Sequence, residues 1–321
     1  MRSNARFRPV SIARFLGTLS FLSLIGSLPI KGQGVVKDSL YSSPIKESGS
    51  VSPFSYELEG EASYVGTGAA KRGSKSAGDI TEISSSAGIV VSTQLNSQSL
   101  LRLGLQWQRY SFDPDPHVPI PDSIQGVNLV LGADFQVSPA LLLRIEALPG
   151  LYGTFRDVRF KDFNVPFEIG ASYFVSADLV FIAGVLVDLD ADTPVFPAIG
   201  VHWKVADKWV IEGIAPRPQL QYLLTDKVTL FAGADLRDTT FRMDEHFGRS
   251  SGIRKLDNAI LEYWEVRASA GLTWKISKNV SLDIEGGCVP YRRFFYPRAD
   301  NFKVLSEDVV PFARIGLSAK F

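Results

Sequence analysis

Apolar and polar side chains alternate one by one along several long stretches of this chain. The clearest stretch covers 259–276, where Trp264, Val266, Ala268, Ala270, Leu272, Trp274 and Ile276 alternate with Glu265, Arg267, Ser269, Gly271, Thr273 and Lys275. Successive side chains of a β-strand point to opposite faces, so this pattern predicts a strand with one apolar and one polar face. At roughly 17 residues the strand would be about three times the usual length.

The same alternation returns in 101–108, 127–137, 228–236, 280–285 and 310–321. In the last of these, Ile315, Leu317 and Phe321 fall on one face, and Arg314 and Lys320 fall on the other. No run of 18 apolar residues occurs from Pro53 onward, which excludes a membrane-spanning helix there. Mean hydropathy is nevertheless slightly positive, at +0.07. A β-barrel reconciles these two observations, because only every second residue of its strands faces lipid.

Short polar turns and long polar connections separate these stretches in turn. Tight turns of Ser, Asn, Asp and Lys suit hairpins, and the longer connections include 113–123, 158–164, 189–194, 243–257 and 297–307. Such an alternation is typical of the periplasmic turns and extracellular loops of membrane barrels. Fourteen strands follow: 54–66, 79–95, 99–112, 124–137, 141–157, 165–175, 179–188, 195–205, 208–214, 218–225, 228–242, 258–276, 280–296 and 308–321. The number falls to twelve if the two short strands within 208–225 do not span.

The terminal aromatic residue of the last strand resembles the closing strand of bacterial outer-membrane β-barrels. The resemblance covers residues 53–321 and is closest to barrel families of no assigned function. It implies an all-β fold, a single antiparallel transmembrane β-barrel in the cell outer membrane. In that superfamily the terminal aromatic residue is the signal read by the barrel-assembly machinery, so the resemblance gives Phe321 that role. The other expected partners are outer-membrane lipid and lipopolysaccharide.

Residues 1–32 form a separate module. Arg2, Arg6, Arg8 and Arg14 precede a moderately apolar run from Phe15 to Ile30, and small residues follow near Gly32 and Gly34. This order predicts a cleaved secretory signal peptide. The next segment, 33–52, is polar and predicts a flexible periplasmic lead-in to the barrel at 53–321.

Charge and composition exclude several classes of function. Five of the 34 bases and none of the 34 acids lie in residues 1–32, so the remainder carries about five negative charges and lacks the basic character of a nucleic-acid-binding protein. Cys288 is the single cysteine, so no internal disulfide or zinc-type ligand set is expected, and we expect no cofactor. His117, His202 and His246 lie in three distant segments, and no nucleophile elbow or phosphate-binding glycine loop occurs. We therefore expect no enzyme.

Charged side chains occupy the face opposite the apolar series and would line the lumen. The candidate lumen-lining residues are Glu57, Glu59, Glu61, Arg102, Arg144, Glu146, Arg237, Glu265, Arg267, Asp283, Glu285 and Arg314. A dry core does not hold so many charges unless they are paired. Two functions remain open: passive transport through a porin-like or small-ligand channel, and a structural or adhesive surface barrel with a filled interior that displays its loops. A soluble exported β-sandwich is a third possibility.

Two further groups of charges have two interpretations each. Glu57, Glu59 and Glu61 would bind a cation, or would pair with Arg314 and Lys320 if the first and last strands adjoin; a spacing of about 7 Å between alternate side chains favours pairing. In the run 291–298, Arg292, Arg293 and Arg298 would hold lipopolysaccharide phosphates, or would be incidental members of an aromatic girdle. The substrate, the pore radius and the oligomeric state do not follow from the sequence.

Overall fold

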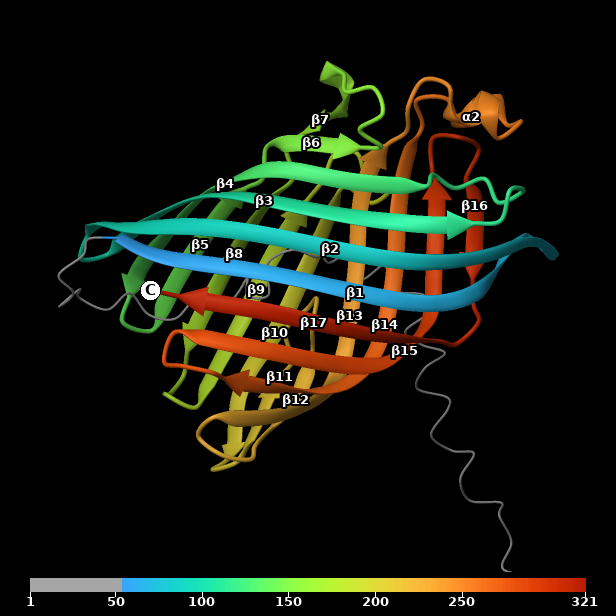
Figure 1. Cartoon of the computed structure of the whole chain (residues 1–321). Helices are drawn as coiled ribbons and strands as arrows, with labels where there is room; N and C mark the ends of the chain where they lie inside the picture. The colour runs from blue at the N-terminus through green and yellow to red at the C-terminus, as the bar shows by residue number, and fades with distance from the viewer. Residues whose placement is uncertain (1–53) are drawn as a thin grey trace, which may run out of the picture. The chain divides into compact units, whose positions relative to one another are not determined.

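The computed structural model describes residues 54–321, which form a closed barrel of fourteen antiparallel strands (Figure 1). The expected signal peptide and the polar lead-in lie outside the described residues. The barrel closes where β1 (Phe54–Arg72) pairs with β17 (Val310–Lys320), in a register that runs from Glu57 opposite Lys320 to Val65 opposite Phe312. The predicted fold class is therefore confirmed, and the β-sandwich alternative is wrong because the sheet has no open edges at this seam.

Eleven of the fourteen strands are unbroken, and three are each interrupted by a short irregularity. The unbroken strands are β1, β2 (Lys75–Asn96), β3 (Ser99–Pro114), β4 (Ser123–Ser138), β9 (Leu179–Val187), β10 (Val195–Ala206), β11 (Trp209–Glu212), β12 (Gln219–Leu223), β13 (Val228–Arg242), β14 (Ile260–Lys275) and β15 (Val280–Tyr296). The interrupted strands are β5 (Leu141–Ala147) with β6 (Gly150–Gly153), β7 (Phe163–Asn164) with β8 (Phe167–Phe174), and β16 (Phe302–Ser306) with β17.

The two shortest strands, β11 and β12, still belong to the wall. β11 pairs with β10 on one side and β12 on the other, and β12 pairs with β13. The number of strands is therefore fourteen, and the alternative of twelve is wrong.

Short turns gather at one end of the barrel, which also holds the C-terminus; this is called the short-turn end below. Long connections gather at the opposite, loop end, where 243–259 carries α2 (Phe247–Ser250) and η3 (Arg254–Leu256), and the β6–β7 connection carries η2 (Phe160–Asp162) (Figure 1). One connection differs from expectation: β1 and β2 pair up to Arg72 opposite Lys75, so a two-residue turn replaces the predicted long loop between 66 and 79. Gly73 adopts a φ of 62° in this turn, a conformation that glycine tolerates without strain.

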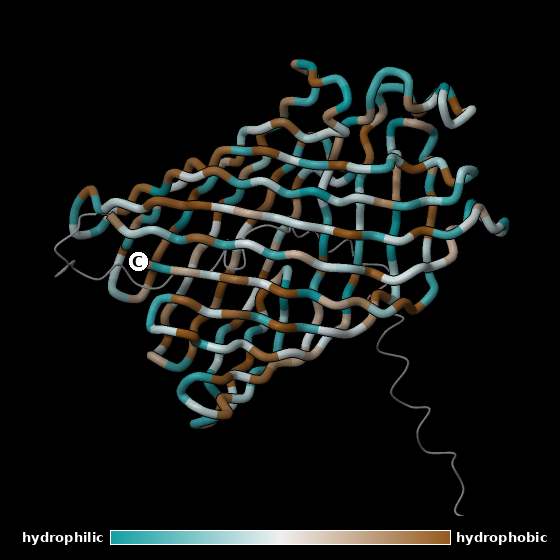
Figure 2. The backbone as a smooth tube through the Cα atoms, in the orientation of Figure 1, coloured by the Kyte–Doolittle hydropathy of each residue, from teal (hydrophilic) through white to brown (hydrophobic). Residues whose placement is uncertain are grey.

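Alternation along the strands produces an apolar outer face and a polar inner one. In β17, Ile315 and Leu317 are exposed on the outside, whereas Arg314 is buried on the inside. Figure 2 shows the same alternation along most strands. None of the described residues forms a helix long and apolar enough to cross a membrane.

The interior at the loop end is a hydrophobic cluster, which we call the aromatic plug. It comprises Ala70, Ile80, Tyr110, Phe112, Val118, Ile120, Ile124, Tyr152, Phe241, Met243, Phe247, Leu256, Ala259, Leu261, Tyr263, Phe294, Tyr296, Ala299, Phe302 and Val304. Nine strands contribute to it, namely β1 to β4, β6 and β13 to β16, and no member comes from β7 to β12.

Strands from opposite walls meet beside the aromatic plug. Arg242 at the end of β13 forms a parallel bridge with Gly153 of β6, so the nine strands close on themselves at the loop end. The remaining strands, β7 to β12, form a separate sector with its own small cluster of Val180, Ile182, Ala198 and Ile214.

Candidate functional site

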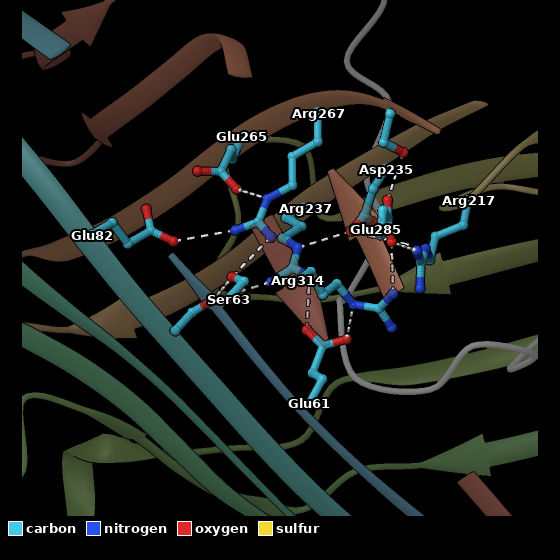
Figure 3. Close-up of polar contacts among 12 residues, drawn as sticks. Glu61, Ser63, Glu82, Arg217, Asp235, Arg237, Glu265, Arg267, Glu285 and Arg314 are labelled. Carbon is cyan, nitrogen blue, oxygen red and sulfur yellow. Dashed lines mark hydrogen bonds and ion pairs between the residues drawn. The ribbon is translucent and has the colours of Figure 1, made fainter. Parts of the chain in front are cut away.

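Ten charged side chains lie across the middle of the lumen, directly below the aromatic plug, in two groups of ion pairs that hydrogen bonds through Ser63 and Ser84 connect into one network. They are the carboxylates Glu61, Glu82, Asp235, Glu265 and Glu285, and the guanidinium groups Arg217, Arg237, Arg267, Arg292 and Arg314. Strands β1, β2, β13, β14, β15 and β17 supply nine of them because each strand turns its polar face inward. Figure 3 shows most of the network.

The upper part of the network is fully enclosed. Arg267 forms ion pairs with Glu265 on its own strand and with Glu82 on β2, the latter with Nη2 and Oε1 3.4 Å apart. Arg267 also donates a hydrogen bond to Ser63 Oγ at 2.9 Å, and Arg292 Nη1 lies 3.3 Å from Glu82 Oε2. Arg267 and Glu265 are 0% exposed, and Glu82 and Arg292 are 1% exposed, so no space for water surrounds these charges.

Tyr263 joins this charged layer to the aromatic plug above it. Its hydroxyl lies 2.9 Å from Glu265 Oε2 and also contacts Glu82. Its ring packs against Tyr110, Phe112 and Phe294, with centroid distances of 5.0, 5.4 and 5.0 Å. The lumen is therefore filled by two successive layers, one ionic and one aromatic.

The lower part of the network links four strands and one turn through shared carboxylates. Glu61 accepts from Arg314 Nε at 2.7 Å and from Arg237 Nη2 at 2.8 Å, while Glu285 Oε2 accepts from Arg314 Nη1 at 2.7 Å and from Arg217 Nη2 at 2.6 Å (Figure 3). Asp235 accepts from Arg237 Nε at 3.0 Å. Charge-assisted bonds of this kind are the strong class of hydrogen bond. Those to Glu61 and Glu285 each connect two different strands or a strand and a turn, whereas the bond between Arg237 and Asp235 lies within β13.

Arg217 enters the lumen from the turn 213–218 between β11 and β12. The backbone of this turn is fixed to β13, because Ala234 N donates to Pro218 O at 3.0 Å and Leu236 N donates to Pro216 O at 2.9 Å. A cavity of about 60 Å³ lies beside Arg217 and is also lined by Glu59, Asp283 and Arg314. Its size is enough for a few water molecules at most.

Further inward-facing pairs continue around the wall. Arg144 forms a bidentate ion pair with Asp134, in which Nε and Nη2 donate to Oδ1 and Oδ2 at 2.7 and 2.8 Å. Arg102 Nη1 lies 3.3 Å from Glu57 Oε2, and Arg102 Nε lies 3.4 Å from Glu146 Oε2. In each case the partners come from neighbouring or nearby strands of the same side of the barrel. The wall is thus cross-linked by ion pairs along much of the lumen.

The structure places all twelve residues of the sequence hypothesis on the inner face. Ten of them enter ion pairs with one another or with other inward residues. Six belong to the central network (Glu61, Arg237, Glu265, Arg267, Glu285, Arg314), and four belong to the side pairs (Glu57, Arg102, Arg144, Glu146). Arg144 pairs with Asp134, Asp283 accepts a hydrogen bond of 2.6 Å from Thr273, and Glu59 lines the cavity.

The pairing expected between the first and last strands is confirmed. Glu61 binds Arg314, and Lys320 Nζ lies 2.5 Å from Glu57 Oε1. Among the described residues, no group of three His, Cys, Asp or Glu side chains is arranged to hold a metal ion.

The expectation that Arg292 contacts lipopolysaccharide is wrong. Arg292 points into the lumen and is buried against Glu82, because the alternation of β15 turns Arg292, Phe294 and Tyr296 inward. Arg293 faces outward, where it stacks on Trp264 and Phe295 and binds Glu262 at 2.9 Å. Arg298 is exposed and binds the connection between β9 and β10 through Asp190, at 3.3 Å.

Sequence reasoning missed Glu82, Tyr263 and Arg217 as members of the site. In β2, polar residues such as Thr81 and Ser85 occupy the outer face as well, so the inward position of Glu82 is hard to read from the pattern. Arg217 lies in a turn between two prolines, where no strand alternation indicates its direction. Tyr263 lies two residues before Glu265, so the alternation places it on the polar face of its strand. An aromatic residue at such a position does not indicate that its hydroxyl contacts a carboxylate.

Residues 53–309 match the model of a family described as a domain of unknown function (DUF6268). A comparison with curated proteins gave no match. Among solved structures, the barrel is similar to a deletion mutant of the monoaromatic hydrocarbon channel TodX, with 8% identity and a TM-score of 0.47 over 88% of this chain and 94% of that one. It is also similar to the COG4313 outer membrane channel from Pseudomonas putida F1, with 8% identity and a TM-score of 0.45 over 86% of this chain and 100% of that one. The NanC porin gives 11% identity and a TM-score of 0.37 over 82% of this chain and 100% of that one.

Proposed function

We propose that this chain, which belongs to the DUF6268 family of unknown function, is an outer-membrane β-barrel. Its role in this proposal is structural. Its filled lumen closes it to free diffusion, and the barrel serves to hold its loops on the far side of the membrane. This is the filled-barrel function of the two that the sequence left open.

The observation that carries the proposal is the enclosure of Arg267 between Glu82 and Glu265. These three side chains are at most 1% exposed and lie across the lumen below the aromatic plug. Moving an ion or a polar solute past them would require breaking buried ion pairs, which costs several kcal/mol per pair. This enclosure supports a closed lumen on the side of the barrel that carries the aromatic plug.

The outer face supports a membrane location. Large apolar side chains are exposed on strand after strand around the wall, among them Tyr64, Ile83, Leu131, Phe181 and Ile315. A water-soluble protein rarely exposes so extended an apolar surface. Trp203, Trp209 and Trp274 lie half exposed beside the short turns, the position of an interfacial girdle.

Passive transport is the second candidate, and the cavity beside Arg217 favours it. This cavity lies on the short-turn side of the ionic network, and Arg217 belongs to a turn rather than to a strand. A displacement of the turn 213–218 would remove Arg217 from Glu285 and enlarge the cavity. Transport would in addition require the aromatic plug to open.

Single-channel recording in planar bilayers separates the two functions. The filled barrel predicts that wild-type protein and an Arg217→Ala variant are both electrically silent, because the aromatic plug remains in place. A Lys227→Ala variant, altered in an exposed turn, is the control for the quality of the preparation. Steady openings of the wild-type protein, or openings that appear in Arg217→Ala alone, would overturn the filled barrel in favour of the channel.

Phe321 is proposed as the recognition residue for the barrel-assembly machinery. Its side chain is exposed, and its backbone is paired with Tyr56 by two hydrogen bonds of 2.9 Å at the short-turn end. Deletion of Phe321 is expected to reduce the amount of folded barrel in the membrane several-fold, measured by its heat-dependent shift on semi-native gels. Phe160→Ala, which alters an exposed aromatic residue at the loop end, is the control, and unchanged insertion of the truncated chain would contradict the proposal.

A further inference from the structure

Two cationic side chains lie against one aromatic ring at the loop end of the barrel. Arg72 Cζ is 4.9 Å and Lys255 Nζ is 5.6 Å from the centroid of Phe302. Arg72 belongs to the tip of the β1–β2 hairpin, Lys255 to η3 and Phe302 to the start of β16. Three segments far apart in the sequence thus bring like charges together at one point.

More bases surround this point. Lys75 is paired directly with Arg72 across the hairpin, Arg254 precedes Lys255, and Lys303 follows Phe302. Lys71 is paired with Leu305, two residues from Lys303 on the outer face of the adjoining strand. We call these six residues the basic rim: Lys71, Arg72, Lys75, Arg254, Lys255 and Lys303.

The basic rim is open to its surroundings. Five of its six side chains are exposed and Lys71 is half-buried. Asp300 contributes a carboxylate, with Oδ2 3.1 Å from Lys255 Nζ, but this aspartate is itself 85% exposed. Like charges held this close repel one another unless counter-charges lie between them, so the site favours a partner that carries several negative groups.

The position of the basic rim indicates which polyanion fits. Lys71 and Lys303 lie on the outer face of β1 and β16, the same face that carries Tyr64 and, along the chain from β16 into β17, Ile315. The surface that would face lipid therefore leads directly into the basic rim at the loop end. Phosphate groups at the head of an outer-leaflet lipid would meet it there.

We propose that the basic rim binds the phosphate groups of lipopolysaccharide. The inference rests on the outer-membrane location proposed above. It assigns the contact with lipopolysaccharide to the basic rim instead of to Arg292. Guanidinium and ammonium groups together suit this ligand, since arginine binds phosphate in a bidentate manner and lysine binds it as a point charge.

The test is a titration of purified full-length protein in detergent with lipopolysaccharide, read out as Kd. A variant carrying Arg72→Ala, Lys255→Ala and Lys303→Ala is expected to bind at least about tenfold more weakly, because it loses three charge-assisted contacts. The matched control carries Lys208→Ala, Lys227→Ala and Lys278→Ala, three bases in the short turns at the opposite end, and is expected to bind like the wild type.

Two further binding measurements test whether the phosphate groups of lipopolysaccharide are what the basic rim recognises. Lipopolysaccharide freed of its phosphates is expected to bind wild-type protein as weakly as intact lipopolysaccharide binds the loop-end variant. Asp300→Asn, which removes the carboxylate from Lys255, is expected to bind intact lipopolysaccharide more tightly than wild type, and this variant keeps every base if the triple variant fails to fold.

Equal affinity of the wild type and the loop-end variant, an equal loss in the short-turn control, or undiminished binding of dephosphorylated lipopolysaccharide would each overturn the proposal. These results are independent of bilayer recording. A silent barrel that ignores lipopolysaccharide refutes the basic rim alone, and a conducting barrel that binds it refutes the filled lumen alone.

Discussion

The nine strands around the aromatic plug and the sector from β7 to β12 share the same alternating pattern but are held together differently. The plug buries twenty residues from nine strands and the loops above them, whereas the cluster inside the sector buries four. The nine-stranded side also contains the ionic layer with Arg267 and Glu82 at its centre. One side of the barrel is therefore a packed core and the other is mainly a wall.

Strand length is the physical source of this difference. β14 and β15 have 16 and 17 residues, so their upper halves extend beyond the part that would span a bilayer and turn Tyr263, Phe294 and Tyr296 toward a common centre. β11 and β12 have four and five residues and end well short of that level. Their backbone instead continues into the turn 213–218, which is bonded to β13.

A few polar contacts fasten the sector to the packed side. Residues 188–194, which connect β9 and β10, reach β13 through Asp188 Oδ2, which accepts from Thr240 Oγ1 at 2.6 Å, and through Asp190, 3.5 Å from Arg242. Thr240 is buried although strand alternation turns it outward, because this connection covers it. Strands with the same hydrophobic alternation thus bury very different numbers of side chains when their lengths differ.

The largest effect is expected from Arg267→Met. The change leaves Glu82 and Glu265 without their shared cation in a dry site and should lower the unfolding free energy by about 3–5 kcal/mol. Tryptophan fluorescence during urea unfolding in detergent micelles measures it. Arg156→Met, which breaks an ion pair with Asp122 between side chains that are 62% and 68% exposed, is the control and should cost at most about 1 kcal/mol. Equal losses in the two variants would remove the distinction between a packed lumen and a solvated one.

The same truncation on the two sides should differ by about 2 kcal/mol. Ile124→Ala in the aromatic plug is expected near the upper end of the range of about 2–5 kcal/mol for such changes, because large side chains on all sides prevent collapse of the cavity. Ile182→Ala in the sector is expected near the lower end, because its cluster is small and can relax. The same urea titration compares them, and a larger loss for Ile182→Ala would reverse the assignment of core and wall.

Backbone amides of the short strands should exchange with solvent faster than those of the long ones. β11 and β12 pair over only four residues and contact few buried side chains, so local opening costs less free energy there than in β14 and β15. Hydrogen exchange followed by mass spectrometry in micelles is expected to show at least about tenfold lower protection, or about 1.4 kcal/mol. Uniform protection around the barrel would show instead that the sector opens only with the whole fold.

The smallest effect concerns two loops on the rim of the packed side. A hydrogen bond from Arg159, between β6 and β7, holds the pKa of Glu245 in the β13–β14 connection below its usual value of 4.5, and the positive charges of His246 and Lys161 act in the same direction. Because the folded-state pKa is lowered, the link is complete above pH 4.5 and is lost as the pH falls through the lowered pKa.

Spin labels at Val158→Cys and Ser250→Cys in a Cys288→Ser background would report this contact. Their distance distribution is expected to be narrow at neutral pH and to broaden only as the pH falls through the lowered pKa of Glu245. Glu245→Gln should give the broad distribution at both pH values. A narrow distribution in that variant would mean that other contacts hold the loops together.

The sequence predicted the fold well because the strands of a β-barrel obey a local rule. Alternation in stretches such as 310–321 assigned each side chain to the outer face or the lumen, and the turn pattern gave fourteen strands, including the two short ones. The prediction failed at the β1–β2 connection, where pairing continues past Gly68 through a register shift that a periodic pattern does not contain. It also failed for Arg292, whose inward direction follows from another register shift between β14 and β15.

The candidate site was predicted only as a list of inward charges. That Glu61 joins Arg314 to Arg237, and that Glu285 joins Arg314 to Arg217, depends on which strands face one another across the lumen. Glu82 was missed because both faces of its strand are polar, and Arg217 because it lies in a turn. No local pattern specifies such contacts.

By itself, then, the sequence determined which residues form strands and which face of each strand is apolar, since both depend on neighbours one or two positions away. Only the packing of strands distant in the chain specifies that the loop half of nine strands closes around an aromatic plug, that β13 meets β6, and that most of the inward charges form ion pairs. Those outcomes depend on the relative lengths and registers of strands distant in the chain, which set how near opposite walls approach.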